Sequence, residues 1–323
     1  MRLSLERLTA EATSTGFRSD VLEKAAHLLG LLESFRSHPF LKGKLALKGG
    51  TALNLFVFDV PRLSVDIDLN YVGGQDREAM LAERPKIEQA LRAVFARQGF
   101  AVRRVPEEHA GGKWLLRYPS ASGQTGNLEV DLNFMFRVPL WPLAILDSQR
   151  VGAWRATGIP VLDVHELAAG KLAALLSRGQ ARDLFDSHRL LRLDGLDRER
   201  LRLTFVLYGA MNRRDWRKVS IDDVAFDGAE LVRQLTPTLR GGGAELQIAS
   251  KDYGPDLVAK CRRVLSAVLP FTEDESLFLD MLLSQGEIDP AILTADTALQ
   301  DRIRRHPRLR WKALNVRRYK DFS

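Results

Sequence analysis

The run VDIDL, residues 65–69, constrains this chain more than any other feature of its sequence. Apolar and acidic residues alternate there with the period of a β-strand, which places Asp66 and Asp68 on one face and apolar side chains on the other. Two neighbouring carboxylates repel each other, so the pair needs open water or a cation between its members. Mg²⁺ is the natural cation, because it prefers hard oxygen ligands and is shared between carboxylates and substrate phosphates.

A later run, NLEVDLNF, repeats this alternation and offers a third carboxylate. Either Glu129 or Asp131 could supply it, and we prefer Asp131 because apolar residues flank it on both sides. Three carboxylates can hold two metal ions, which activate the attacking oxygen and stabilise the leaving phosphate. We therefore predict that the metal ligands are Asp66, Asp68 and Asp131.

A glycine turn precedes the acidic pair in the sequence. The apolar run LALKGG predicts a short strand, TALNLFVF predicts a helix, and Gly49, Gly50 and Thr51 lie at their junction. Glycines allow close approach of the backbone, and the free N–H groups at a helix start favour phosphate. The chain contains no Walker A or GxGxxG sequence, so the P-loop and Rossmann classes lack their phosphate-binding loops.

The runs LKGGTALNL and RLSVDIDL together resemble the AbiEii/MenT family of nucleotidyltransferase toxins, a branch of the DNA polymerase β-like nucleotidyltransferases. In that superfamily a glycine-rich turn binds phosphates and an Asp-x-Asp pair binds Mg²⁺, for which Mn²⁺ can substitute. Residues 62–68 match the Arg-x-Ser-x-Asp-x-Asp segment of the family without departure. The resemblance covers residues 44–190, and the nucleotide-binding residues it implies near the turn are Gly49, Gly50, Thr51 and Ser64.

A second polar group lies in ELAAGKLAALLSRGQARDLFD, residues 166–186. Its spacing alone is typical of surface salt bridges between helices. The family carries a Lys followed by an Arg-Asp-x-x-Asp segment, which correspond here to Lys171, Arg182, Asp183 and Asp186. The resemblance implies that Lys171 binds the triphosphate, and that Asp186 orients Lys171 or accepts a proton from the attacking hydroxyl. Arg182 either contacts the nucleotide or, like Asp183, only braces the helices.

The periodicity predicts an α/β (α+β) fold, in which a mixed sheet is followed by a mostly helical half. By resemblance, the first part is a polymerase β-like nucleotidyltransferase domain. Helices are predicted at 20–36, 76–98, 163–178, 182–193, 197–212, 256–268, 274–284 and 297–320, and further strands at 100–105, 113–118 and 128–135. We expect residues 137–162 to be irregular, and Gly241–Gly243 to form a loop. The predicted domains are 1–150, with the glycine turn and the acidic pair, and 151–323, with Lys171 and a basic tail.

The positive charge of the chain is concentrated at its end. From Arg302 onward, nine Lys or Arg face the single Asp321, a local charge of +8 in a chain whose net charge is +7. Cations that neutralise phosphates, interleaved with aromatic rings, are typical of single-stranded nucleic-acid binding. A solvated helix face or a surface for an acidic protein would have the same pattern. The predicted RNA-binding residues are Arg302, Arg304, Arg305, Arg308, Arg310, Lys312, Arg317 and Arg318, with Trp311, Tyr319 and Phe322 as stacking partners.

Composition favours a soluble cytoplasmic protein. The sequence has no apolar run of bilayer length and no signal-peptide pattern at its start. Its one cysteine, Cys261, cannot form an internal disulfide, and we expect an inert thiol.

The function that these observations favour is Mg²⁺-dependent transfer of a nucleoside monophosphate from NTP to an acceptor. By resemblance, the acceptor is the 3′ end of tRNA, whose extension would block translation, and the protein is a toxin with a cognate antitoxin partner. A metal-dependent RNA nuclease could use the same carboxylates to activate water. A catalytically idle NTP- or RNA-binding module is a further alternative, although neither alternative needs a glycine turn for a triphosphate.

Overall fold

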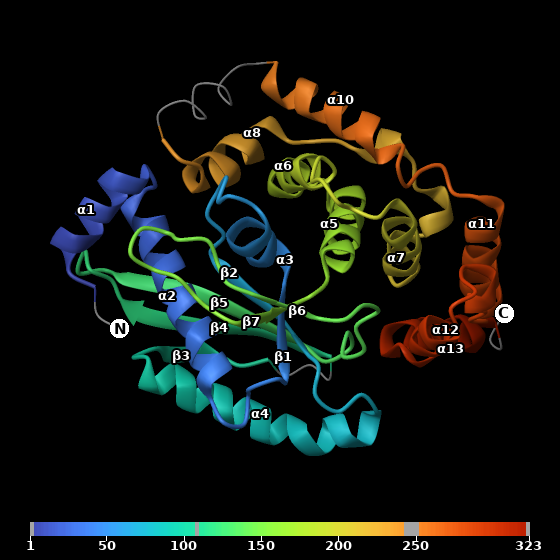
Figure 1. Cartoon of the computed structure of the whole chain (residues 1–323), viewed down its shortest axis with the longest axis horizontal. Coiled ribbons are helices and arrows are strands. Elements are labelled where there is room, and N and C mark those ends of the chain that lie inside the picture. The colour runs from blue at the N-terminus through green and yellow to red at the C-terminus, as the bar shows by residue number, and fades with distance from the viewer. Residues whose placement is uncertain (1–2, 107–109, 242–251, 321–323) are drawn as a thin grey trace. The chain divides into compact units, whose positions relative to one another are not determined.

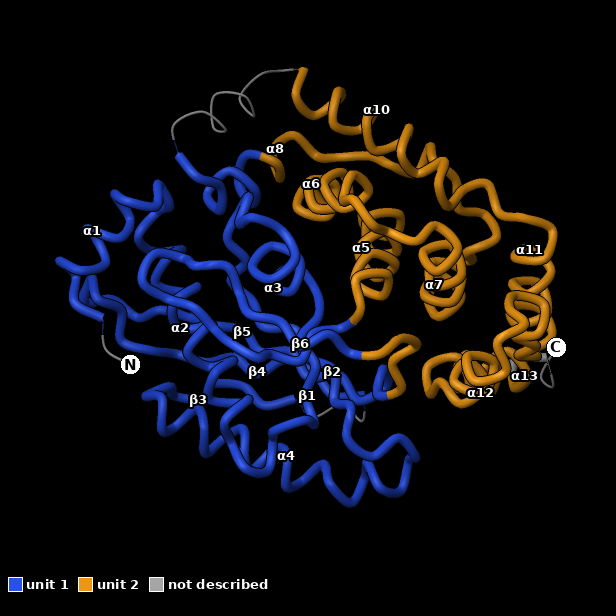
Figure 2. The backbone as a smooth tube through the Cα atoms, viewed as in Figure 1, with its two compact units in different colours: residues 1–137, 143–162, 232–249 blue, residues 138–142, 163–231, 250–323 orange. Residues whose placement is uncertain are grey.

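The computed structural model describes residues 3–106, 110–241 and 252–320. The chain divides into two compact units, coloured separately in Figure 2. Unit 1 comprises residues 1–137, 143–162 and 232–249, and unit 2 comprises residues 138–142, 163–231 and 250–323. The predicted mixed sheet and the mostly helical second half correspond to these two units, which confirms the fold class.

Unit 1 is built on a seven-stranded sheet of described residues, with the order β3-β4-β5-β2-β1-β7-β6 (Figure 1). The strands are β1 (Leu45–Lys48), β2 (Asp66–Tyr71), β3 (Ala101–Arg104), β4 (Gly111–Pro119), β5 (Thr125–Asn133), β6 (Ala144–Leu146) and β7 (Ile159–Val161). The β2–β5 and β1–β7 pairs are parallel and the other pairs are antiparallel, so the sheet is mixed as predicted. Because residues alternate between the faces of a strand, β4 and β5 place buried residues on one face and more exposed residues on the other.

Helical segments of unit 1 flank these strands in the sequence. They are α1 (Leu5–Thr15), α2 (Ser19–Ser37), α3 (Gly49–Ala52), the π-helical turn η1 (Leu53–Val57) and α4 (Arg77–Arg97). Phe35 of α2 and Trp114 of β4 both contact the ring of Phe95 of α4, with ring centroids 6.0 and 5.6 Å away respectively. Ile67 and Val130 are paired across β2 and β5 and are also completely buried. The acidic residues between them therefore belong to the other face of the sheet.

Two strands lie in the region that we expected to be irregular. β7 pairs in parallel with β1 through Leu47 and Val161, and β6 pairs with β7 at the edge of the sheet. Three residues are too few to show a period of two, so the sequence pattern misses both strands. The pairing also places residues 151–162 in unit 1, so the compact units do not coincide with a single division after residue 150.

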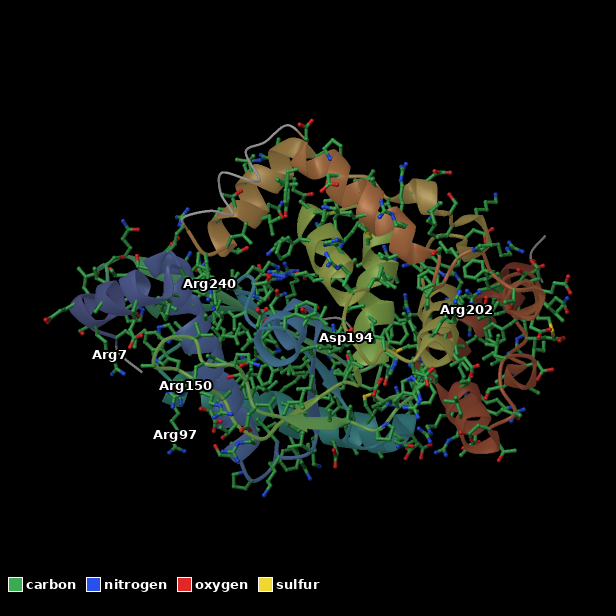
Figure 3. All side chains as sticks on the ribbon, turned by 45° about the horizontal axis from the view of Figure 1, so that its top comes forward. Arg7, Arg97, Arg150, Asp194, Arg202 and Arg240 are labelled. Atoms are coloured by element: carbon green, nitrogen blue, oxygen red, sulfur yellow. The ribbon has the colours of Figure 1, made fainter. Side chains whose placement is uncertain are left out.

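A segment from much later in the sequence also belongs to unit 1. Leu239 forms an isolated β-bridge with Arg62, and the N–H of Gly241 donates to the Gly16 carbonyl at 2.7 Å. The guanidinium of Arg240, labelled in Figure 3, lies 5.2 Å from the ring centroid of Phe17. Of the predicted glycine loop, residues 242–243 lie outside the described part of the chain.

Unit 2 is helical. Its α-helices are α5 (Val164–Arg178), α6 (Ala181–Leu190), α7 (Arg198–Ala210), α8 (Gly228–Glu230), α10 (Tyr253–Leu265), α11 (Glu273–Asp280), α12 (Thr297–Arg305) and α13 (Pro307–Lys320). Shorter 3₁₀ or π turns occur at η2 (Trp216–Lys218), η3 (Ile221–Asp223), η4 (Leu231–Leu235), η5 (Thr236–Thr238), η6 (Met281–Gln285) and η7 (Pro290–Ile292), of which η5 and most of η4 lie in unit 1. None of the helices in the described ranges is long and apolar enough to cross a membrane.

The predicted helix at 297–320 is two helices, so the prediction of one continuous helix is wrong. His306 interrupts it with an extended backbone conformation, φ −63° and ψ 118°. Proline lacks a backbone N–H and disfavours the helical conformation in the residue before it, and Pro307 therefore ends α12 and begins α13.

Cys261 lies in α10 with its side chain completely buried. Burial raises the pKa of its thiol to about 12, because an apolar surrounding disfavours the thiolate. The structure thus agrees with the prediction of an inert thiol.

Candidate active site

Four carboxylates share one face of the sheet in unit 1. In the parallel pair β2–β5, Asp66 lies opposite Glu129 and Asp68 lies opposite Asp131. All four residues are partly exposed, in contrast to the buried apolar residues that alternate with them. The structure therefore brings the predicted Asp66, Asp68 and Asp131 together with the alternative Glu129.

Two lysines that the sequence reasoning did not single out extend this row of charges. Lys48 of β1 lies opposite Asp68, and Lys113 of β4 lies opposite Asp131. Lys113 donates to Glu129 at 2.7 Å, and this bond raises the pKa of the lysine. Lys48 borders the glycine turn in the sequence, but only the register of the strands shows that it faces the acidic row.

The electrostatics of Asp131 favour a nearby cation. Burial raises the pKa of Asp131, and the charges of Asp68 and Glu129 raise it further. The positive charges of Lys48 and Lys113 act in the opposite direction, but the pKa stays above its ordinary value. A divalent cation would favour the ionised form that burial and the neighbouring carboxylates disfavour.

The glycine turn packs directly against the acidic pair. Gly49 follows the last residue of β1 with a φ of +74°, and a Cβ at this position would lie 2.2 Å from Oδ2 of Asp68. The Thr51 hydroxyl donates to the backbone carbonyl of Asp66 at 2.5 Å, which ties the turn to β2. The helix begins at Gly49, two residues earlier than expected, so its first N–H groups lack intrahelical acceptors beside these carboxylates. Only glycine can bring the backbone this close to Asp68.

The carboxylates fit a divalent ion that is shared with a ligand. Among residues 3–106, 110–241 and 252–320, no three His, Cys, Asp or Glu side chains are placed to hold a metal ion by themselves. Mg²⁺ is usually held by one or two carboxylates together with substrate phosphates and waters, not by a cage of protein groups. A carboxylate pair beside a glycine turn fits that mode, whereas a preformed site of Asp66, Asp68 and Asp131 is not present.

The other two motif residues before β2 are buried. Arg62 is 2% exposed, and its guanidinium donates to the Leu63 carbonyl at 3.2 Å. Ser64 is 7% exposed. Burial of Arg62 indicates that it supports the segment leading into β2, and the role of Ser64 in nucleotide binding remains a prediction.

In unit 2, Lys171 belongs to a buried ionic cluster. Its Nζ lies 2.9 Å from Asp183 and 3.1 Å from Asp186, and both aspartates are almost fully buried. Arg178 donates to Asp183 at 2.7 Å. Burial would raise the pKa of Asp183, but the charges of Lys171 and Arg178 hold it below its ordinary value. Among the described residues, these contacts join two positive groups, Lys171 and Arg178, with two negative groups, Asp183 and Asp186.

Arg178, and not Arg182, bonds to Asp183 in this cluster. Contact of Arg182 with the nucleotide stays a prediction. Within the described residues, no hydrogen bond or ion pair of Arg182 is present. Arg178 lies seven residues after Lys171 on the same helix, and that spacing was the only available signal.

The basic residues of α12 and α13 have differing environments. Arg302 donates to the Leu140 carbonyl at 2.6 Å and Lys312 donates to the Asn212 carbonyl at 2.8 Å, so both help to hold unit 2 together. Arg308 lies 4.5 Å from the ring centroid of Trp311, which is 45% exposed. Phe322 and the side chain of Tyr319 lie outside the described part of the chain.

Comparisons with known proteins bear on this site. The model of a family described as the nucleotidyl transferase AbiEii toxin of type IV toxin–antitoxin systems matches residues 30–314. The solved structure of MenT4, a nucleotidyltransferase toxin from Mycobacterium tuberculosis H37Rv, superposes with a TM-score of 0.61 at 16% sequence identity. The match covers 94% of this chain and 98% of that chain, and it shows a shared fold. No curated protein sequence matches the chain.

Proposed function

The chain belongs to the AbiEii family of nucleotidyltransferase toxins, and from this premise we propose that it transfers a nucleoside monophosphate from NTP to the 3′ end of an RNA. The observation that carries the proposal is the contact of the Gly49 turn with Asp68. At this contact, backbone N–H groups that can donate to phosphate oxygens lie beside a carboxylate that can bind a cation. A metal–triphosphate needs both kinds of group next to each other.

Asp66 and Asp68 would hold the divalent cation, which we propose to be Mg²⁺, and Asp131 would join them. When bound, the cation offsets charge on the phosphates of the NTP. The first N–H groups of the turn at Gly49 and Gly50 would contact the phosphate oxygens. Thr51 fixes the turn through its bond to β2 and is therefore a positioning residue.

Lys171 and Asp186 are proposed as catalytic residues on the family resemblance. Asp186 is completely buried and lies 3.1 Å from Lys171 Nζ. A buried carboxylate that already holds an ammonium group has little access to an attacking hydroxyl. This geometry favours the orienting role for Asp186 over proton transfer.

We propose tRNA as the acceptor and the blocking of translation as the consequence. Basic residues of α13 would bind the RNA backbone, and the exposed Trp311 would stack on a base. Membership in a family of type IV toxin–antitoxin systems implies a cognate antitoxin protein.

The test is incubation of the purified protein with α-labelled NTPs, Mg²⁺ and total tRNA. We expect label on tRNA with an intact 3′ end and none on tRNA whose 3′ end has been oxidised with periodate. Asp68→Asn should abolish labelling, whereas Asp20→Asn, at an exposed ion pair with Arg18, should leave it unchanged.

Several outcomes would contradict the proposal. Shortened RNA would favour a nuclease, and NTP binding without any labelling of RNA would favour an idle binding module. Equal labelling by the Asp68→Asn and Asp20→Asn proteins would exclude the acidic pair from the reaction.

A further inference from the structure

We propose that Lys48 binds the phosphate chain of the NTP. This inference rests on the proposed function and adds to it a residue that the motif comparison does not assign. Its basis is the position of Lys48 at the end of β1, between the acidic row and the glycine turn.

The strand register fixes which way Lys48 faces. Lys48 is paired with Asp68 in the antiparallel pair β1–β2, and Asp68 is paired with Asp131 in the parallel pair β2–β5. Directly paired residues project to the same face of a sheet. The Lys48 side chain thus emerges on the face that carries the carboxylates.

Lys48 and Lys113 stand at the two ends of this row but differ in their contacts. The ammonium group of Lys113 is bonded to Glu129 at 2.7 Å. Throughout residues 3–106, 110–241 and 252–320, no carboxylate forms an ion pair or hydrogen bond with Lys48. Lys48 is therefore the lysine of this row whose charge is available to a ligand.

The next residue brings the phosphate-binding backbone to the same place. Lys48 directly precedes Gly49, which turns the chain onto the Asp68 carboxylate. Lys48 is thus the sequence neighbour of the residue whose N–H group would bind the phosphate. Ammonium groups bind phosphate strongly, as point charges with three donors.

A purely structural role is the main alternative. Lys48 could serve only to offset the repulsion among the carboxylates, since its charge acts on Asp131. The two roles predict different effects on binding when Lys48 is replaced by an uncharged residue. Loss of a phosphate contact weakens NTP binding, whereas loss of charge balance makes divalent-ion binding tighter without weakening NTP binding.

The experiment measures binding in the absence of RNA, with a fluorescent NTP analogue and Mg²⁺, and with unlabelled NTP and NMP as competitors. We expect Lys48→Met to weaken NTP binding by about 10- to 100-fold, the range for a hydrogen bond between charged groups, and to weaken NMP binding less. Lys42→Met, at an exposed lysine that precedes β1, is the control and should stay within about threefold of the natural protein. Lys48→Arg keeps the charge and should retain most of the NTP affinity.

The possible results separate this proposal from the one it rests on. If the natural protein binds no NTP, both proposals fail. If it binds NTP and a folded Lys48→Met protein binds equally well, only the role of Lys48 is overturned. Should Lys48→Met not fold, Lys48→Arg decides the matter, because loss of NTP binding by a folded Lys48→Arg protein also contradicts a role based on charge. Tighter divalent-ion binding with unchanged NTP affinity would establish charge balance instead.

Discussion

Replacing Gly49 with alanine tests whether the glycine turn is held against the acidic pair for function. Gly43 provides a matched control, because its φ is +75° and that of Gly49 is +74°. A side chain at Gly43 would meet no heavy atom within 4 Å, whereas one at Gly49 would lie 2.2 Å from Oδ2 of Asp68. Both substitutions therefore force an alanine into the left-handed backbone conformation, but only Gly49→Ala also brings a Cβ against Asp68.

The expected loss in the free energy of unfolding follows from the backbone strain and from the displacement of Asp68. An alanine in the left-handed conformation costs about 1–2 kcal/mol, so Gly43→Ala should lower the free energy of unfolding by about that amount. Gly49→Ala must in addition force the Asp68 side chain out of its rotamer, which costs about 0.5–1.5 kcal/mol. The difference between the variants in stability is small, but the displaced carboxylate can no longer hold a cation beside the turn. We expect NTP binding to fall at least about tenfold in Gly49→Ala and to be unchanged in Gly43→Ala.

Urea unfolding gives the stability of each variant, and titration with a fluorescent NTP analogue gives the affinity. In an Asp68→Ala background the added cost of Gly49→Ala should shrink, because the carboxylate that meets the new Cβ is gone. The reasoning is refuted if Gly49→Ala binds NTP as the natural protein does. It is also refuted if Gly43→Ala loses NTP binding to the same extent.

Three further predictions concern unit 2. Burial raises the pKa of Glu166 to about 7, so the folded protein binds this proton more tightly than the unfolded chain. Stability should therefore fall by about 3 kcal/mol as the pH rises from about 4.5 to 7, and Glu166→Gln should remove that slope in urea unfolding followed across pH. Asp183→Asn leaves the buried Lys171 with one carboxylate fewer and should lower the free energy of unfolding by about 3–5 kcal/mol, which a thermal or urea melt would detect. Trp311→Ala should weaken binding of single-stranded RNA by about 1–3 kcal/mol in fluorescence anisotropy, and unchanged binding would argue against stacking on this ring.

The sequence predicts the centre of unit 1 well because its signals there are local. Alternation in VDIDL determines which face Asp66 and Asp68 occupy, and the paired glycines mark the end of β1. The family motif then relates the two segments to one another. Local patterns of this kind are sufficient to predict which face of a strand a residue occupies and where a turn begins.

What the sequence does not predict depends on pairing between distant segments. Lys48 and Lys113 join the acidic row only through strand register, which no local pattern reveals. Spacing on one helix predicts that Lys171 and Arg178 share a face, but the bond from Arg178 to Asp183 depends on how the turn between α5 and α6 folds back. The three-residue strands β6 and β7 are likewise defined by their partners more than by their own residues.

Because residues 232–241 belong to unit 1, they affect the order in which unit 1 can fold during synthesis. The Leu63 N–H donates to the carbonyl of Thr238 at 2.8 Å, and Leu235 and Leu239 are buried. During synthesis on the ribosome, α5, α6 and α7 are therefore made before the last segment of unit 1 is available to pack against its amino-terminal part. A nascent chain that stops after residue 162 lacks that segment, so we expect unit 1 to reach its final packing only after residue 241 has been synthesised.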